Sequence, residues 1–223
     1  MIYTLPKSGT HFLLPFINSL PGQRRKVIEH VHGPTIPCDF LASHKKVVAI
    51  RDPRDFWVSM RDYIDIVFSK NQSIRMLKPN FDRQSYLKLN KNERLVALIS
   101  STANSPLHPV AVRDLFRNVT ECIGKPKVYI MRFEDFMGEK SGGSNVRQLA
   151  EIQGMLRHFG WEMTDPQVQK LLEQCWRKSP TFHTSQIGRW KSEFTPEVTR
   201  AFKKHWNKYL LAWGYEQTPN WNH

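Results

Sequence analysis

Short apolar runs alternate with longer amphipathic stretches along this chain. The short, β-prone runs predict four strands, at residues 2–5, 27–31, 46–50 and 127–132. A continuous β-branched run such as residues 46–50 is typical of a parallel sheet that is covered on both faces. The longer stretches carry apolar residues at helical spacing and predict helices at residues 10–20, 56–68, 110–121, 145–158, 165–177 and 196–212. This alternation predicts an α/β fold with a central, mainly parallel sheet flanked by helices.

The segments between these elements are polar or rich in glycine and proline. Residues 69–110 are expected to be mostly helical, residues 138–144 to form a mobile loop, and residues 178–195 to be irregular. No repeat, low-complexity tract or linker divides the sequence. With 223 residues, of which 40% are hydrophobic, the chain can bury a sizeable core, so we expect one domain over residues 1–223.

Net charge and cysteine content indicate which ligands and which cellular compartment to expect. Lys and Arg number 33 against 20 Asp and Glu, and this net charge of +13 attracts anions such as nucleotides or acidic glycans. Cys38, Cys122 and Cys175 are odd in number and widely spaced, which predicts buried thiols in a reducing compartment rather than a disulfide framework or a zinc site. The sequence contains no uncharged apolar stretch of about 18 residues, and no leader precedes the first loop. We therefore expect a cytoplasmic protein without a transmembrane segment.

The strongest chemical signal is the segment LPKSGTHF at residues 5–12, between a predicted strand and a predicted helix. A loop in this position can point several backbone N–H groups at one anion, aided by the positive end of the helix. Gly9 permits close approach, Ser8 and Thr10 add hydroxyl donors, and Lys7 adds a charge. It is not a Walker A loop, because GxxxxGK[ST] is absent. The alternative interpretation is a simple Gly/Ser turn with a solvated lysine.

A second constellation begins with the segment RDPRD at residues 51–55 and includes Ser59. Arg51 lies at the carboxyl end of a predicted strand, which is where open α/β sheets bind ligands. Ser59 lies on the following predicted helix, so a guanidinium and a hydroxyl could meet at one phosphate. The alternative interpretation is a helix-capping turn with surface ion pairs.

Together these motifs resemble one family, the sulfotransferases that use 3′-phosphoadenosine 5′-phosphosulfate (PAPS). LPKSGTHF is similar to the YPKSGTTW loop that cradles the 5′-phosphosulfate, and RDPRDFWVS is similar to the RNPKDxxVS segment that binds the 3′-phosphate. GRWKSEFT at residues 188–195 resembles GDWKNxFT, and the strand ending at residues 132–135 resembles the YED segment. The matches run in family order over nearly the whole chain. The resemblance implies a P-loop-like, three-layer fold.

The resemblance also assigns residues to the donor. Lys7 matches the lysine that stabilises charge on the departing oxygen, and Ser8, Gly9, Thr10 and His11 match the phosphate-cradling loop. Phe12 matches the tryptophan that stacks on adenine.

Three further positions match donor contacts of the family. Arg51 and Ser59 correspond to the ligands of the 3′-phosphate. Phe133 stands where a tyrosine commonly meets the adenine.

The resemblance makes His32 the catalytic base, because His32-Gly33-Pro34 is similar to part of a KTHLP-like segment. A histidine can accept the acceptor's proton, since its pKa lies near neutral pH. His30, two residues earlier, is the alternative.

The chain departs from the family just before the last motif. Arg-Lys-Gly is replaced by His183, Thr184 and Ser185, and Arg189 replaces an aspartate. We therefore expect Ser185, Gly188 and Arg189 to provide donor contacts in a different way. Pro196 and Arg200 replace residues of a family dimerisation segment, which leaves the oligomeric state open.

These matches predict in-line transfer of a sulfuryl group from PAPS to a hydroxyl or amine, on a small-molecule or glycan acceptor. Lysine, arginine and backbone dipoles would neutralise the donor, so no metal is expected. The alternative enzyme class is a P-loop kinase for small molecules or nucleotides. A basic nucleic-acid-binding protein is a third hypothesis; the sequence contains no zinc finger or recognition-helix motif, so nucleic acid is not an expected partner.

Overall fold

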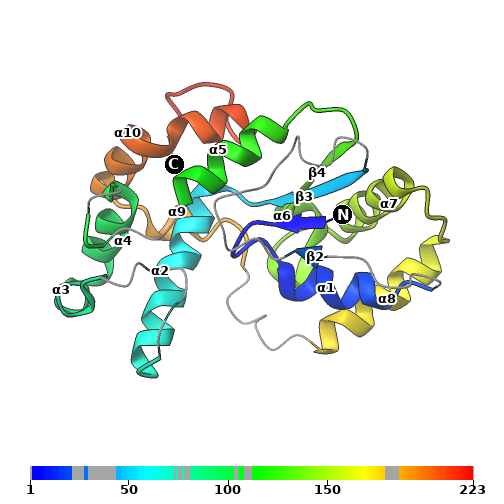
Figure 1. Ribbon diagram of the computed structural model, residues 1–223, viewed down its shortest axis with the longest axis horizontal. Helices are drawn as coiled ribbons and strands as arrows, with labels where there is room; N and C mark the ends of the chain where they lie inside the picture. The colour runs from blue at the N-terminus through cyan, green and yellow to red at the C-terminus, as the bar shows by residue number, and fades with distance from the viewer. Residues whose placement is uncertain are drawn as a thin grey trace. The chain divides into compact units, whose positions relative to one another are not determined.

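The computed structural model describes residues 2–21, 28–29, 44–72, 74, 77, 81–102, 105–107, 112–178 and 186–222. These residues form two compact units, and each unit is built from two separate stretches of chain. Unit 1 comprises Met1–Arg51 and Glu121–Ile187, and unit 2 comprises Asp52–Thr120 and Gly188–His223. The elements of both units are labelled in Figure 1.

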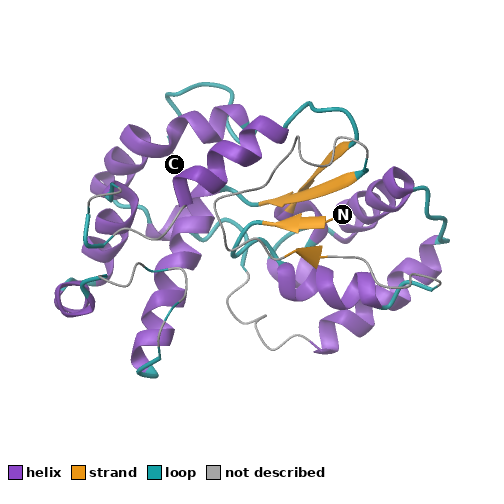
Figure 2. Ribbon diagram, in the orientation of Figure 1, coloured by secondary structure: helices purple, strands orange, loops and turns teal. Residues whose placement is uncertain are grey.

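Unit 1 contains a small parallel sheet. Its strands are β1 (Ile2–Thr4), β2 (Ile28–Glu29), β3 (Lys46–Ile50) and β4 (Val128–Arg132), in the order β2-β1-β3-β4 (Figure 2). All three strand pairs are parallel. The prediction of a mixed α/β protein with a parallel sheet and flanking helices is therefore confirmed. The ends of the strand predicted at residues 27–31 lie outside the described residues.

Helices of unit 1 pack with the sheet around one hydrophobic core. They are α1 (Thr10–Asn18), α6 (Phe133–Phe136), α7 (Asn145–Phe159), α8 (Asp165–Lys178) and the short 3₁₀ helix η1 (Glu139–Ser141). The core joins β3 residues such as Val47 and Ala49 to Phe16 of α1, Leu156 of α7 and Leu172 of α8. Every residue of β3 is buried, as the continuous apolar run predicted.

Unit 2 is helical. It contains α2 (Pro53–Ser69), α3 (Arg83–Lys88), α4 (Lys91–Ser100), most of α5 (Val112–Cys122), α9 (Trp190–Glu193) and α10 (Pro196–Ala212). Helices α2, α4 and α10 contact one another. Their core is aromatic: the ring centroids of Trp57 and Trp206 are 4.8 Å apart, and Phe116 stacks on Trp213 at 4.6 Å. Edge and stacked contacts of this kind add to the free energy gained by burial.

The glycine-rich segment at residues 138–144 is more ordered than the sequence indicated. Gly138 and Gly142 have positive φ, and η1 lies between them with Ser141 buried. The amide of Gly143 donates to the carbonyl of Gly138 at 2.9 Å, which closes the turn. Residues 178–195, predicted as irregular, include the short helix α9.

Cysteine pairing also differs from the prediction. Cys122 is disulfide-bonded, so the expectation that it carries a thiol is wrong. Cys175 is buried, as expected, and Cys38 lies outside the described residues. The argument for a reducing compartment, which rested on unpaired thiols, loses its basis. Across the described ranges, no helix is long and apolar enough to cross a bilayer.

Candidate anion-binding site

The loop from Leu5 to Gly9 connects the carboxyl end of β1 to the amino end of α1 and is tied to both. The amide of Leu5 donates to the carbonyl of Ala49 on β3 at 3.2 Å, which continues the parallel ladder by one residue. The hydroxyls of Thr4 and Thr10 lie 2.5 Å apart and join the strand to the helix. The loop therefore starts and ends at defined points on the edge of the sheet.

Two residues of this loop have left-handed backbone conformations. Lys7 has a φ of 64° and Gly9 a φ of 83°. A left-handed conformation is uncommon for lysine and costs free energy, and such residues are concentrated at functional sites. Left-handed residues in tight turns also help to direct successive N–H groups to one side, where an anion can bind. The amide of Ser8 donates to the carbonyl of Leu5 at 3.1 Å within the loop, and the two left-handed residues make the loop a candidate anion-binding turn.

Gly9 is required by its surroundings. A Cβ atom at this position would lie 2.7 Å from Cζ of Phe136 and 3.2 Å from Cδ2 of Phe133. No side chain fits at such distances unless the buried ring of Phe136 moves. Gly9 also caps α1, whose first turn contains no acidic residue, so the positive end of the helix dipole is not neutralised by a side chain of that turn.

The hydroxyl of Ser8 provides an independent indication of a ligand. Ser8 is fully buried, and its Oγ has no hydrogen-bond partner among the residues that the structure describes. A buried polar atom without a partner costs about 1–3 kcal/mol, so such atoms are rare in native proteins. An anion on the loop would accept the proton of this hydroxyl.

Arg51 connects the loop to a distant part of the chain. It follows β3 directly, is 3% exposed, and donates from Nη1 to the carbonyl of Lys7 at 3.1 Å and from Nη2 to the carbonyl of Gln186 at 3.0 Å. Its guanidinium carbon lies 4.2 Å above the ring centroid of Phe133. Lys7 and Arg51, predicted to share the carboxyl edge of the sheet, are thus in direct contact through the backbone of Lys7.

No family model, curated protein or solved structure significantly matches this chain. Assignment of a function to the loop therefore depends on its motifs and on its local geometry.

The two aromatic residues predicted to meet the adenine are inside the protein. Phe12 is 1% exposed, and its ring packs against Phe136 and, at 5.3 Å between centroids, against Trp176. Phe133 is also 1% exposed and lies under Arg51. Both rings are buried in this structure, and their contact with an adenine stays a prediction. Phe12 belongs to the apolar side of α1, which packs on the core.

In unit 2, the first turns of α2 carry the remainder of the RDPRD motif. Asp52 caps the helix by accepting the amide of Arg54 at 2.8 Å, and Ser59 lies two turns further along, 6% exposed. Asp55 is 1% exposed and accepts two backbone N–H groups, from Gly188 at 2.6 Å and from Trp190 at 2.9 Å. Sequence reasoning missed this role because Asp55 was treated as part of a capping turn.

Arg189, predicted to contact the donor, is engaged by two carboxylates. It pairs with Asp62 at 2.6 Å and with Glu193 at 3.2 Å. Glu193 also accepts from Arg61 at 3.1 Å and from Lys91 at 2.8 Å. Burial alone would raise the pKa of Glu193, but hydrogen bonds from Lys91 and Arg61 outweigh burial and lower it to about 2. Arg189 therefore serves an ion-pair network in this structure.

The structure does not describe every predicted site residue. His32, its alternative His30, and Ser185 lie outside the described residues. His11 is described and exposed at the start of α1.

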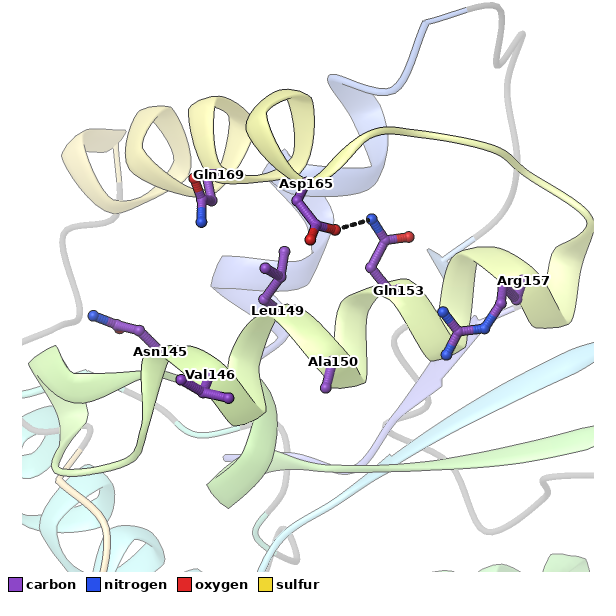
Figure 3. Close-up of a pocket in the computed structure, with 8 residues that line it drawn as sticks. All are labelled: Asn145, Val146, Leu149, Ala150, Gln153, Arg157, Asp165 and Gln169. Atoms are coloured by element: carbon purple, nitrogen blue, oxygen red, sulfur yellow. Dashed lines mark hydrogen bonds between the residues drawn. The ribbon is translucent and has the colours of Figure 1, made fainter.

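A groove of about 480 Å³ lies between α7 and α8 (Figure 3). It is lined by Asn145, Val146, Leu149, Ala150, Gln153, Arg157, Asp165 and Gln169. The amide of Gln153 donates to Asp165 at 2.9 Å across it. None of the predicted site residues lines this groove, so it is separate from the loop at Lys7.

Proposed function

We propose that this protein is a sulfotransferase that transfers a sulfuryl group from PAPS to a hydroxyl or amine. The observation that carries the proposal is the loop between β1 and α1. There, the buried Ser8 hydroxyl lacks a partner among the described residues, Lys7 and Gly9 are left-handed, and Arg51 contacts the loop backbone. These features favour an anionic ligand at the carboxyl edge of a parallel sheet.

The order of residues in the loop favours a sulfated donor over a nucleoside triphosphate. A Walker A loop places its lysine after the last glycine, next to the β- and γ-phosphates. Here Lys7 precedes Gly9, as in the sulfotransferase loop that the segment resembles. A P-loop-like arrangement of three layers and the binding of PAPS are both part of the proposal.

The proposed reaction is an in-line displacement at sulfur. The acceptor oxygen or nitrogen forms a bond to sulfur while the bond between sulfur and the bridging oxygen breaks, and the electron pair stays on the departing phosphate. Lys7 and the loop amides stabilise that developing charge. The acceptor's proton goes to a base, for which the resemblance proposes His32.

Ligand-dependent stability is the decisive test of this proposal. We expect 3′-phosphoadenosine 5′-phosphate (PAP) to raise the melting temperature, since a ligand at 100 times its Kd stabilises by about 2.7 kcal/mol. ATP with Mg²⁺ and 5′-AMP should stabilise much less. Transfer of radiolabelled sulfate from PAPS to a panel of phenols, amines and glycans then tests activity. Stabilisation by ATP with Mg²⁺, but not by PAP, would replace the proposal with a P-loop kinase.

The acceptor and the location belong to the proposal as well. We propose a small-molecule or glycan acceptor and a cytoplasmic protein. The disulfide at Cys122 is atypical of the cytoplasm and counts against this location.

A further inference from the structure

Helix α10 carries a row of basic residues along its exposed face. Arg200, Lys204 and Lys208 are spaced by four positions, so they lie on one side of the helix with a rise of about 6 Å between neighbours. All three are exposed. None of them has an acidic partner among the residues that the structure describes. The opposite side of α10 is buried in unit 2 through residues such as Phe202 and Trp206.

A second basic row lies beside the first, on α5 (Figure 1). Arg113 and Arg117 are also four positions apart. The ring of Phe116 between them packs on Trp206 at 5.1 Å and on Tyr209 at 5.2 Å between centroids, and the guanidinium carbon of Arg113 lies 4.9 Å from the ring centroid of Trp206. These residues of α5 and α10 all belong to unit 2, so the two rows are neighbours within one compact unit.

His205 lies between the two rows and is affected by both. Burial lowers the pKa of His205, and the positive charges of Arg113 on α5 and Lys204 on α10 lower it further. The two charges that act on the imidazole are thus both positive, and they come from different helices. The rows therefore produce one shared positive potential.

Acidic residues do little to neutralise this potential. Helix α10 contains a single acidic residue, Glu197 in its first turn, against four lysines and arginines. On α5, Arg117 pairs with Asp114 at 2.8 Å, but these side chains are 63% and 44% exposed, so the pair is weak in water. Lys203 does not belong to the rows, because its ammonium group donates to the carbonyl of Trp221 at 2.6 Å. The remaining basic side chains can bind an external anion.

The groups around these charges favour one class of polyanion. The aromatic rings between α5 and α10 are buried, so none is open to stack on a nucleic-acid base. Asn207, the side-chain amide of α10 that could read base edges, is bound to Trp221 and Pro219. In the described part of the chain, large exposed hydrophobic residues occur on α2, α3 and α7 but not on α5 or α10, so these rows lack side chains that insert into a bilayer. An acidic glycan needs neither stacking nor insertion, because it presents sulfates and carboxylates on a flexible chain.

We infer that the basic surface formed by Arg113, Arg117, Arg200, Lys204 and Lys208 binds a linear acidic glycan. Sulfates and carboxylates along the glycan pair with side chains that recur about every 6 Å along each helix. The inference is independent of the proposed function, because it involves neither the donor nor a transfer step.

The test measures the binding of a fluorescently labelled heparin decasaccharide to the whole chain by anisotropy. The double variant Lys204→Glu with Lys208→Glu should raise the Kd at least about 20-fold, because two attractive charges become repulsive. The dependence of log Kd on log salt concentration should become shallower by about 2, since two fewer counterions are displaced. Lys204→Gln with Lys208→Gln adds no acid to the helix and should raise the Kd at least about 5-fold, which keeps the test valid if the first variant does not fold.

Lys88→Glu with Lys170→Glu is the matched control. Both lysines are exposed, on α3 and α8, and the double variant changes the net charge by the same amount. It should raise the Kd for heparin less than about 3-fold, because charges away from the basic surface are screened by salt. Equal losses in the two Glu pairs would show a response to net charge alone and would overturn the inference. Tighter binding of a duplex DNA, or of vesicles containing phosphatidylserine, than of heparin at the same salt concentration would also overturn it.

Discussion

Replacement of Gly9 by alanine tests how closely the backbone of the candidate anion-binding loop approaches Phe136 of α6. The added Cβ would lie 2.7 Å and 2.8 Å from two ring atoms of Phe136, inside any real contact distance. Because Phe136 is itself fully buried, its ring has little room to move. Overpacking of this kind costs about 1–3 kcal/mol. The left-handed φ of 83° adds about 1 kcal/mol for any residue with a Cβ.

Gly124→Ala separates these two effects. Gly124 has a similar φ of 75°, but a Cβ there meets nothing within 4 Å among the described residues. It should therefore cost only the backbone strain of about 1 kcal/mol, compared with about 2–4 kcal/mol for Gly9→Ala. Urea unfolding followed by circular dichroism measures both free energies, with equal slopes required for the comparison.

A double variant tests the cause. Phe136→Leu removes the ring that the new methyl group would meet first. The cost of Gly9→Ala should therefore fall towards that of Gly124→Ala in this background, and the remaining difference reflects the 3.2 Å approach to Phe133. Equal costs for Gly9→Ala and Gly124→Ala in the original background would refute the reasoning, and with it the close approach of α6 to the loop.

Three other predictions follow from the structure and the proposal. Lys7→Ala and His32→Ala should each lower the turnover of PAPS by at least about 100-fold, measured by sulfate transfer, and a near-normal rate removes that residue from the mechanism. Gly154→Ala, normally stabilising by about 1 kcal/mol in a helix, should destabilise instead, because the methyl group would collide with the hydroxyl of Tyr129; a higher melting temperature contradicts this. The pKa of Glu193 is lowered from 4.5 to about 2. The free energy that the ionised Glu193 adds to folding should therefore be complete above pH 4.5 and lost as the pH falls towards 2. Glu193→Gln should flatten this part of a curve of stability against pH.

The apolar pattern of the sequence was sufficient to predict the strands of the sheet and most of the helices. The run at residues 46–50 coincides with β3, since a strand buried on both faces leaves a continuous apolar signal. Helix α2 begins at Pro53, three residues before the predicted start, because Asp52 and Pro53 form a capping signal that was assigned to the preceding turn. Periodicity alone does not locate helix ends.

The sequence pattern could not predict contacts between residues that are far apart in the chain. Nothing in the local pattern shows that Asp55 binds amides more than 130 positions away, because a buried acid on a first helical turn resembles an ordinary cap. Phe12 packs on the core side of α1, as its spacing with Leu13, Phe16 and Ile17 indicates, and the contact with adenine that its motif suggests stays a prediction.

The loop at residues 5–9 and the turn at residues 188–190 differ in how completely their polar groups are satisfied. At residues 188–190, two amides are bound by Asp55 and the guanidinium of Arg189 is bound by two carboxylates. At the loop, Lys7 is strained and the hydroxyl of Ser8 lacks a partner among the described residues. Local inconsistencies of this kind are typical of places where a ligand supplies the compensation. The loop therefore has the most to gain if an anion binds, whereas the polar groups at residues 188–190 are already satisfied within the protein.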